Sequence, residues 1–372
     1  MTLRRRILAG LLLSSALALA ALAFAVARNA PCPPPEPLPD DAVPMRAIVR
    51  PCYGSTDVLR LQDVARPVPA DGEVLVKVHA ASINPLDWHR MTGTPYAMRL
   101  SSGLGSPSDA RMGWDFAGTV EAVGDGVSRF GPGDAVFGGR TGALAEYVTV
   151  REAGAILPKP ADLDFGQAAA LPMAAATALQ GLRDEGRIRP GHRVLVNGAS
   201  GGVGTFAVQI AKALGAEVTG VCSGRNVHLV RGLGADHVID YTRQDFTEGD
   251  ERYDLILDNV GNHPLRDTAR ALAPGGVLVI VSGPKRDPWL GPLSRTLKAA
   301  MLSPFVDDEM TTLFADVDRD ALADVAELVR SGGLAPVIDR RYPLREVPAA
   351  IEYLATGRAR GKVVIEIVEE GR

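Results

Sequence analysis

The chain has 372 residues but only three cysteines, Cys32, Cys52 and Cys222. Their spacing matches neither a disulfide framework nor the four-cysteine lobe of a structural zinc site. Aromatic residues are also scarce, at 5% of the chain, and the net charge is -4. Because no basic patch with interleaved aromatics occurs beyond the first residues, we exclude nucleic acid as a partner. The length suits two domains, each held together by a hydrophobic core.

Long apolar runs without charge are absent except at the N-terminus. Residues 7–27 are apolar or small, three arginines precede them, and an acidic, proline-rich segment follows. Such a run is long enough to cross a bilayer, and its flanking charges place the N-terminus in the cytoplasm. We therefore predict a single-pass membrane segment through residues 7–27, with the membrane as a partner. Export after signal cleavage is the alternative, because Ala25 and Ala27 form a small-x-small pair and the arginines resemble a twin-arginine signal.

The residue pattern changes twice in the rest of the chain. Six prolines between Pro31 and Pro39 indicate an extended linker. Short β-rich runs punctuated by glycine and proline then predict a β-barrel-like module, and later apolar runs alternate with helical patterns, which predicts a doubly wound parallel sheet. The predicted divisions are a leader at 1–27, a linker at 28–44, the β module at 45–165, an α/β domain at 166–334, and a return to the β module at 335–372.

A glycine-rich turn lies inside the first strand–helix–strand unit of the α/β domain. It runs from Gly198 to Gly204, after an apolar strand at 193–197 and before a helix that extends to Leu214. In that context glycines allow tight turning, and free amides at the helix N-terminus meet a dinucleotide pyrophosphate. We predict cofactor contacts from the turn residues Ser200, Gly201, Gly202 and Val203.

The end of the second strand indicates which dinucleotide binds. Sites specific for NAD place an acidic residue there, to bond the ribose hydroxyls. This chain has Ser223 and Arg225 instead, which can hydrogen-bond and neutralise a 2′-phosphate. We therefore predict NADPH as the cofactor, with NADH as the alternative.

The order of these segments resembles the medium-chain dehydrogenase/reductase superfamily, within it the zinc-independent quinone oxidoreductase-like group. The resemblance covers residue 45 to the end and implies a GroES-like β-barrel-type catalytic domain with a Rossmann domain. At the positions where zinc-dependent members bind their catalytic metal, this chain has Asn84, Trp114 and a residue near Met173. None of these completes a tetrahedral zinc site, so we predict no metal.

Without a metal, the resemblance implies reduction of quinones or α,β-unsaturated carbonyls by hydride transfer, since conjugation in the substrate delocalises the charge. It implies that the reacting group is lined by Asn84, Asp87 and Tyr96, with Tyr96 as the donor to the developing oxyanion. His89, where relatives often have another aromatic residue, is a weaker candidate.

The resemblance also implies further contacts to the cofactor. They are Thr177 beneath the nicotinamide, Tyr241 near the adenosine phosphate, Asn259 and Gly261 after the fourth strand, and Lys362 near the C-terminus. Relatives often have a lysine where this chain has Asn226, so we assign the 2′-phosphate contact to Arg225. The group's usual assembly is a homodimer. Residues 284–312 are amphipathic and suit a cap over the substrate cleft or a contact with a membrane or partner.

A second class of function is also open at this point. A protein of this kind can bind NADPH without catalysis and regulate a membrane partner through a redox-dependent change of shape. Retention of Asn84, Asp87 and Tyr96 favours the enzyme.

Overall fold

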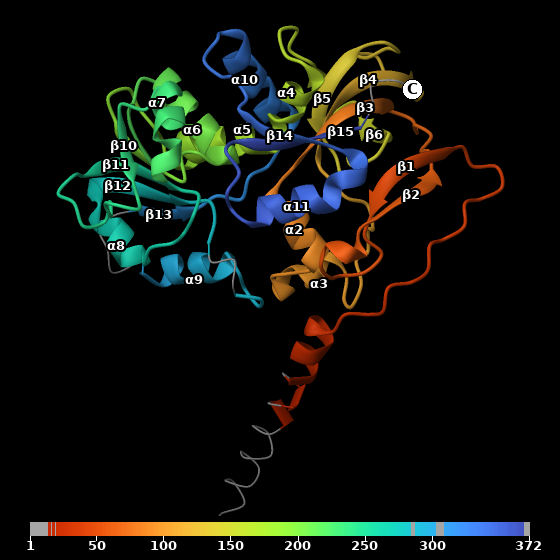
Figure 1. The fold of residues 1–372 in the computed structure, drawn as a ribbon, viewed down its shortest axis with the longest axis horizontal. Coiled ribbons are helices and arrows are strands. Elements are labelled where there is room, and N and C mark those ends of the chain that lie inside the picture. Colours follow the sequence, from red (N-terminus) through yellow and green to blue (C-terminus); the bar gives the residue numbers. More distant parts are fainter. Residues whose placement is uncertain (1–13, 16, 19, 284–286, 303–308, 368–372) are drawn as a thin grey trace, which may run out of the picture.

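The computed structural model describes residues 14, 15, 17, 18, 20–283, 287–302 and 309–367. Two sheets dominate it, and Figure 1 shows the parallel sheet with its helices on the left and the mixed sheet on the right. The chain leaves the mixed sheet after β7 (Ile156–Pro158), builds the parallel sheet, and returns with β14 (Ile338–Pro343) and β15 (Lys362–Glu366).

The parallel sheet has the order β10-β9-β8-β11-β12-β13, and every neighbouring pair is parallel. Its order reverses between β8 and β11, where ligands bind in doubly wound folds. The strands are β8 (Arg193–Asn197), β9 (Glu217–Cys222), β10 (His237–Asp240), β11 (Tyr253–Asp258), β12 (Leu272–Ile280) and β13 (Glu309–Thr312). The strand β13 was not foreseen, because its four residues lie within the stretch predicted to be a cap.

The mixed sheet has the order β14-β15-β3-β4-β5-β7, with β6 also paired to β3. The returning strand β15 pairs antiparallel with β3, so that Val363 faces Ile83 across the sheet. The other strands are β3 (Glu73–Ile83), β4 (Asp115–Val123), β5 (Ala135–Gly139) and β6 (Tyr147–Arg151), and a separate hairpin-like pair consists of β1 (Pro44–Val49) and β2 (Arg60–Ala65). The predicted fold class, a GroES-like β module with a Rossmann domain, is confirmed.

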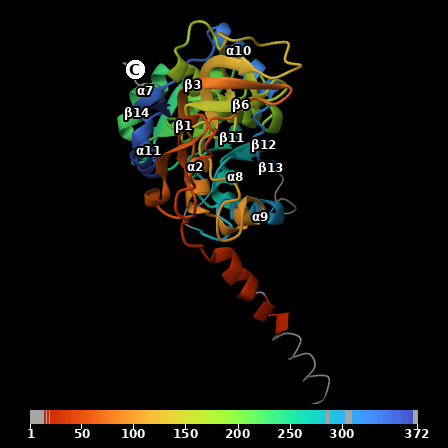
Figure 2. The ribbon, with the colours of Figure 1, turned by 90° about the vertical axis from the view of Figure 1, so that its right-hand side faces the viewer.

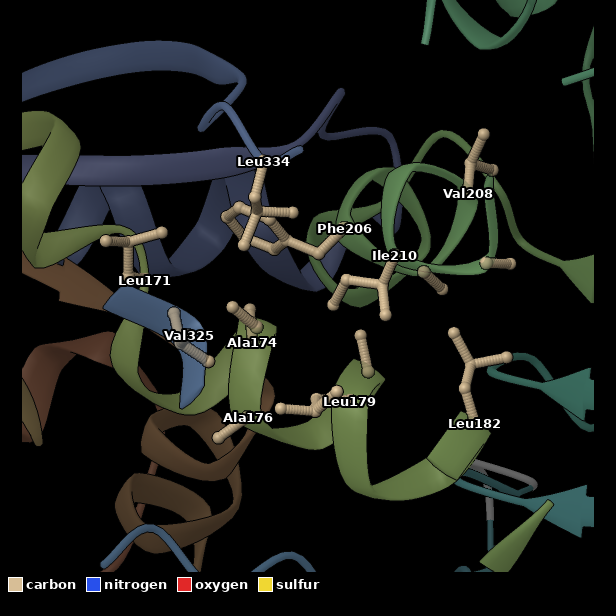
Figure 3. Packing of buried hydrophobic residues seen from close by; sticks show 14 of the residues in the cluster. Leu171, Ala174, Ala176, Leu179, Leu182, Phe206, Val208, Ile210, Val325 and Leu334 are labelled. Atoms are coloured by element: carbon tan, nitrogen blue, oxygen red, sulfur yellow. The ribbon is translucent and has the colours of Figure 1, made fainter. Parts of the chain in front are cut away.

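The α-helices are α2 (Pro85–Thr92), α3 (Arg99–Ser102), α4 (Phe165–Ala169), α5 (Pro172–Gln180), α6 (Gly202–Ala213), α7 (Val227–Gly232), α8 (Leu265–Arg270), α9 (Leu293–Leu302), α10 (Arg319–Arg330) and α11 (Val347–Ala355). Most helices cover the parallel sheet or connect it to the mixed sheet, whereas α2, α3 and α11 lie beside the mixed sheet (Figure 1). The largest core cluster lies where α5, α6 and α10 meet, and Figure 3 shows Leu171, Leu179, Phe206 and Val325 packed there. Alanines in α5 let α6 approach closely, which fixes the helix that begins at the glycine turn.

The N-terminal segment corrects the predicted localisation. Among the residues that the structure describes, no helix is both long enough and apolar enough to cross a membrane. The span predicted through residues 7–27 is therefore wrong, and with it the localisation that named export as the alternative; residues 7–13, 16 and 19 of that span lie outside the described residues. Residues 20–27 are helical and lead away from the body of the molecule in both views (Figure 1, Figure 2). The described helix at 20–27 is far shorter than the roughly 20 residues that a membrane span requires, and at its end Val26, only 7% exposed, packs on the protein itself.

Two of the three cysteines also correct an expectation. Cys32 in the proline-rich linker and Cys52 after β1 form a disulfide, with their Cα atoms 5.0 Å apart. The two cysteines are 20 residues apart in sequence, and this spacing did not indicate that they pair. They meet because the linker folds back along the β module. The amide of Ala30 donates to the carbonyl of Gly105, and Arg60 donates to the carbonyl of Pro33, which keeps the linker in place.

Arg99 fastens the N-terminal segment to the catalytic domain. Its side chain is 1% exposed and lies over the rings of Tyr53 and Tyr96, with its Cζ atom 4.5 and 4.6 Å from the two ring centroids. The guanidinium donates to the carbonyls of Val26, Ala27 and Arg28 at 3.1–3.3 Å, and to those of Thr92 and Gly93. One cation thus satisfies the end of the leader helix and the end of α2 together.

We expect Arg99→Met to lower the free energy of unfolding by about 3 kcal/mol, because several buried carbonyls lose a charged donor. Urea unfolding of the full chain measures this. Arg330→Met is the control: its side chain is 74% exposed, so its change should stay within about 0.5 kcal/mol. Equal stabilities of the two variants would contradict the role given to Arg99.

Candidate active site

A cleft of about 380 Å³ lies between the two sheets. The glycine turn, the end of β9 and the loop after β11 form one side of it, and Asn84, Pro85 and the C-terminal residues 357–359 and 361–363 form the other. Of the predicted site residues, those in its lining are Asn84, Ser200, Gly201, Gly202, Val203, Ser223, Arg225, Tyr241, Asn259 and Lys362. The others, Asp87, Tyr96, Thr177 and Gly261, lie outside the lining.

The glycine turn has a conformation that other residues would disturb. Gly198 has φ of +81°, and a Cβ atom on Gly204 would lie 2.8 Å from the backbone of Ala199. These glycines let β8 turn directly into α6, whose first amides have no acceptor within the helix. The carbonyl of Ser200 accepts from the amide of Gly361, so the C-terminal return contacts the turn directly.

A buried polar network closes the other side of the cleft. The ammonium of Lys362 lies 2.6 Å from Asn84 Oδ1 and 3.2 Å from Asp115 Oδ2. Asn84 Nδ2 and the hydroxyl of Ser82 also donate to Asp115 Oδ2, at 2.9 and 2.8 Å. Lys362 is 3% exposed and Asp115 is fully buried. Each polar group in the network therefore has a partner of complementary charge or hydrogen-bonding type.

Strand register explains how distant residues meet in this network. Ser82 near the end of β3 faces Asp115 at the start of β4 across the sheet, and Ile83 faces Val363 of β15. Asn84 and Lys362 follow and precede these positions directly. The amide of Met173 donates to Asp115 Oδ1 at 3.0 Å, which anchors α5 to the same carboxylate.

Asp87 lies behind Asn84 rather than in the cleft. Its Oδ2 atom accepts from the backbone amide of Asn84 at 2.8 Å, at the N-terminus of α2. Burial raises the pKa of Asp87 to about 6, although the amide of Asn84 and the charge of Arg90 oppose the shift. This contact makes Asp87 a residue that positions Asn84. Its predicted catalytic role has no support from the lining of the cleft.

Tyr96 is likewise outside the lining of the cleft. Its ring meets that of Trp289 edge to face, with centroids 5.1 Å apart, and its amide donates to the carbonyl of Pro288. Residues 287–292, which precede α9, thus cross from the Rossmann domain to the catalytic domain beside Tyr96. This contact agrees with a cap from that stretch, and the role of Tyr96 as a donor stays a prediction.

Asn226 organises the end of the cleft expected to hold the adenosine. Its Nδ2 atom donates to the hydroxyls of Ser200 and Ser223, at 2.9 and 3.3 Å, and its Oδ1 atom accepts from Arg360 at 2.8 Å. The side chain of Arg225 donates to the carbonyl of Arg358 at 2.9 Å. The C-terminal loop therefore brings the guanidinium of Arg360 to the side chain of Asn226 and places Arg358 in the lining of the cleft.

The other predicted cofactor residues surround the opposite end. Thr177 donates to the carbonyl of Met173 at 2.6 Å, within α5. Gly261, with φ of +69°, donates its amide to Asp258 Oδ1, and Arg295 donates to the other oxygen of that carboxylate at 2.5 Å. These contacts fix the loop that places Asn259 in the lining.

Several residues in or beside the site were not identified from the sequence: Asp115, Asn197, Asn226, Asp258, Arg295, Arg358 and Arg360. Asp115 had a local signal, because it is a charged residue at the start of the strand, directly after Trp114, where the resemblance implies a lost zinc ligand. Arg358 and Arg360 had none, since their position depends on the return of the chain.

A nicotinamide dinucleotide fits the residues present. The first amides of α6 suit a pyrophosphate. The Oδ1 atom of Asn259 is buried and has no hydrogen-bond partner among the described residues, which leaves an acceptor for a cofactor hydroxyl or amide. In the described ranges no group of three histidines, cysteines or carboxylates is placed to hold a metal.

Fold and cleft together define a two-domain oxidoreductase that uses a nicotinamide cofactor. The comparisons with known proteins agree: a family model described as an alcohol dehydrogenase GroES-like domain matches residues 70–161, and one described as a zinc-binding dehydrogenase matches residues 233–365. The chain belongs to the medium-chain dehydrogenase/reductase superfamily, in its zinc-independent quinone oxidoreductase-like group.

Several individual proteins are similar to most of this chain. The mitochondrial NAD(P)H oxidoreductase RTN4IP1 of Bos taurus is 36% identical over 352 residues, which cover 85% of this chain and 87% of the relative. The 2-methylene-furan-3-one reductase of Solanum lycopersicum is 34% identical, with 84% and 76% covered. The solved quinone oxidoreductase of Coxiella burnetii superposes with a TM-score of 0.77 at 32% identity, covering 88% of this chain and all of that chain. These names favour an enzyme over a redox sensor.

The raised pKa of Asp87 predicts how stability varies with pH. Its pKa rises from 3.8 to about 6 on folding, so its stabilising contribution is complete below about pH 4 and is lost as the pH rises through 6. Asp87→Asn keeps an acceptor for the Asn84 amide and removes the charge. Relative to the native chain, this variant should gain roughly 2–3 kcal/mol between pH 4 and pH 7. Urea unfolding across that range tests it, and a constant difference would contradict it.

Proposed function

We propose that the protein reduces quinones or α,β-unsaturated carbonyls with NADPH. The observation that carries this proposal is the cleft in which Asn84 and Lys362 of the catalytic domain face the glycine turn of the Rossmann domain. The names of the relatives, which include an enone reductase and a quinone oxidoreductase, support the same class of substrate.

When bound, a reduced nicotinamide supplies a hydride, which in this reaction is added to the β-carbon of an enone or to a quinone, while a proton from the surroundings completes the reduction. The chain's own residues prepare the place for this transfer. Lys362 and Asp115 hold the side chain of Asn84 in one orientation, because both of its polar atoms are bonded. Burial of this network keeps bulk water away from one wall of the cleft.

The preference for NADPH rests on charge at the adenosine end. Arg225 and Arg358 both line the cleft there beside Ser223 and Tyr241. Asp240 lies close to Gly224, but its carboxylate accepts from the hydroxyl and amide of Thr242 at 2.8 and 3.0 Å. Two guanidinium groups therefore remain available for a 2′-phosphate. We retain the homodimer as a prediction.

The first experiment tests the reaction itself. The purified full chain is given NADPH with a panel of quinones and enals, and NADPH oxidation is followed by absorbance. We expect turnover with at least one of them. Binding of NADPH without turnover of any member would refute the reductase.

Tyr96→Phe, assayed beside the native chain, should lower kcat if Tyr96 donates to the oxyanion, and an unchanged kcat would remove it from the mechanism.

The second experiment tests cofactor preference. Arg358→Ala should raise KM for NADPH about tenfold, because one charge-assisted hydrogen bond to the 2′-phosphate is lost, and should leave KM for NADH within about twofold. Arg330→Ala, far along α10, is the matched control. Equal increases of KM for both cofactors would contradict a contact with the 2′-phosphate.

A further inference from the structure

Two arginines of the catalytic domain contact Trp114, one through its side chain and one through its backbone amide, and a third lies within electrostatic range of the first. The guanidinium of Arg90 in α2 lies over the indole, 5.9 Å from its centroid, and donates to the hydroxyl of Thr141 at 3.3 Å. The amide of Arg140, after β5, donates to the carbonyl of Trp114 at 2.8 Å. Arg50, after β1, is near enough for the charge of Arg90 to act on it. We call Arg50, Arg90, Trp114 and Arg140 the arginine recess.

Several donors of the arginine recess are buried without a partner. Arg50 is 3% exposed, and its Nη2 atom donates to the carbonyl of Asp109 at 3.2 Å. Its Nε and Nη1 atoms, the Nε atom of Arg140 and the indole Nε1 atom of Trp114 have no hydrogen-bond partner within the part of the chain that the structure describes. Because an unsatisfied buried donor is costly, above all on a cation, such a group of donors is typical of a binding site for an acceptor.

The neighbouring carboxylates do not neutralise the arginine recess. Asp109 forms a two-pronged ion pair with Arg111, Asp115 is paired with Lys362, and Asp87 accepts from the amide of Asn84. Across the described ranges, none of the three arginines of the recess is in an ion pair. Burial lowers the pKa of Arg50 and the charge of Arg90 adds to this shift, whereas contacts with Tyr53 and the charge of Asp109, which is itself paired with Arg111, oppose it. The recess therefore carries excess positive charge that suits an anion.

The arginine recess adjoins the network at the cleft. Arg90 is in the helix that begins directly after Asn84, roughly 9 Å further along its axis. Trp114 immediately precedes Asp115, whose carboxylate contacts both Asn84 and Lys362. Arg90, Trp114 and Arg140 are half-buried, so parts of these side chains reach solvent, whereas the partnerless atoms themselves are covered. None of the four residues is in the lining of the cleft, and the recess is connected to it through Asn84 and Asp115.

We propose that the arginine recess binds a carboxylate carried by the substrate, so that the substrate is an anionic enone or quinone. Planar guanidinium groups match the two oxygens of a carboxylate, and the indole N–H supplies a further donor. This inference rests on the proposed reduction. It adds what the fold class leaves open, namely which conjugated carbonyl compounds the site selects.

A pair of substrates that differ only in charge tests the proposal. One is trans-3-benzoylacrylate, and the other is its methyl ester, which has the same conjugated ketone without the carboxylate. We expect kcat/KM of the full chain with NADPH to be at least tenfold higher for the acid. In parallel, calorimetry measures binding of the saturated product, 3-benzoylpropionate, to the chain with NADP⁺, because that readout needs no turnover.

Substitutions of single arginines test whether the preference for the acid arises at the arginine recess. Arg50→Met and Arg90→Met remove the charge and keep much of the side-chain volume. Each should lower kcat/KM for the acid and the affinity for 3-benzoylpropionate about tenfold, and leave kcat/KM for the ester within about twofold. Arg270→Met, on α8 in an exposed ion pair with Asp267, should change none of these values. If Arg50→Met does not fold, the half-buried Arg90 decides the question.

The two proposals can fail separately. If acid and ester are reduced equally well and the variants affect both alike, the carboxylate site is overturned and the reduction stands. If neither enone nor any quinone or enal of the panel is reduced, but 3-benzoylpropionate binds the native chain and loses affinity in Arg90→Met, the reductase is refuted and the carboxylate site stands. If 3-benzoylpropionate does not bind the native chain, the carboxylate site is overturned.

Discussion

The contact between Lys362 and Asp115 holds together several strands and a helix that are distant in sequence. Two charges separated by 247 residues in sequence meet at 3.2 Å in a place where neither is more than 3% exposed. An ion pair removed from water is stable only when further hydrogen bonds satisfy both groups. Asp115 therefore requires Asn84, Ser82 and the amide of Met173 in place, and these contacts hold β3, β4, β15 and α5 together.

The same contact determines the shape of the cleft. Because Lys362 is the first residue of β15, the loop before it must pass the glycine turn, and Gly361 donates to the carbonyl of Ser200 there. That loop also carries Arg358 and Arg360 to the adenosine end. A single return of the chain thus closes the catalytic sheet, orients Asn84 and supplies cations for the cofactor. A change in this loop is expected to affect both ends of the cleft.

The sequence predicted what depends on neighbouring residues. Alternation of strands and helices indicated the parallel sheet, and the glycines at 198–204 indicated its binding turn. Asp115 was missed because its importance comes from partners that only the pairing of β3 with β4 and β15 brings close. Spacing from Asn84 did not reveal that Tyr96 turns toward Trp289. The hydropathy of the leader indicated a membrane span, although no described helix is long enough for one, and it did not register that Arg99 binds the carbonyls at the end of the leader.

The distribution of charge along the cleft gives the site its polarity. Arg225 and Arg358 stand at one end, the neutralised pair of Lys362 and Asp115 is near the middle, and the arginine recess adjoins the other side. The lack of net charge in the middle of the cleft suits hydride transfer. During the transfer the nicotinamide becomes cationic while the substrate gains negative charge, so a fixed net charge there would stabilise one of them and destabilise the other. The arginines at the two ends can bind anionic groups without changing the relative stability of the hydride donor and acceptor in the middle of the cleft. The arginines also differ in burial: Arg225 and Arg358 at the adenosine end are exposed, whereas Arg50 of the recess is buried and lies outside the lining of the cleft.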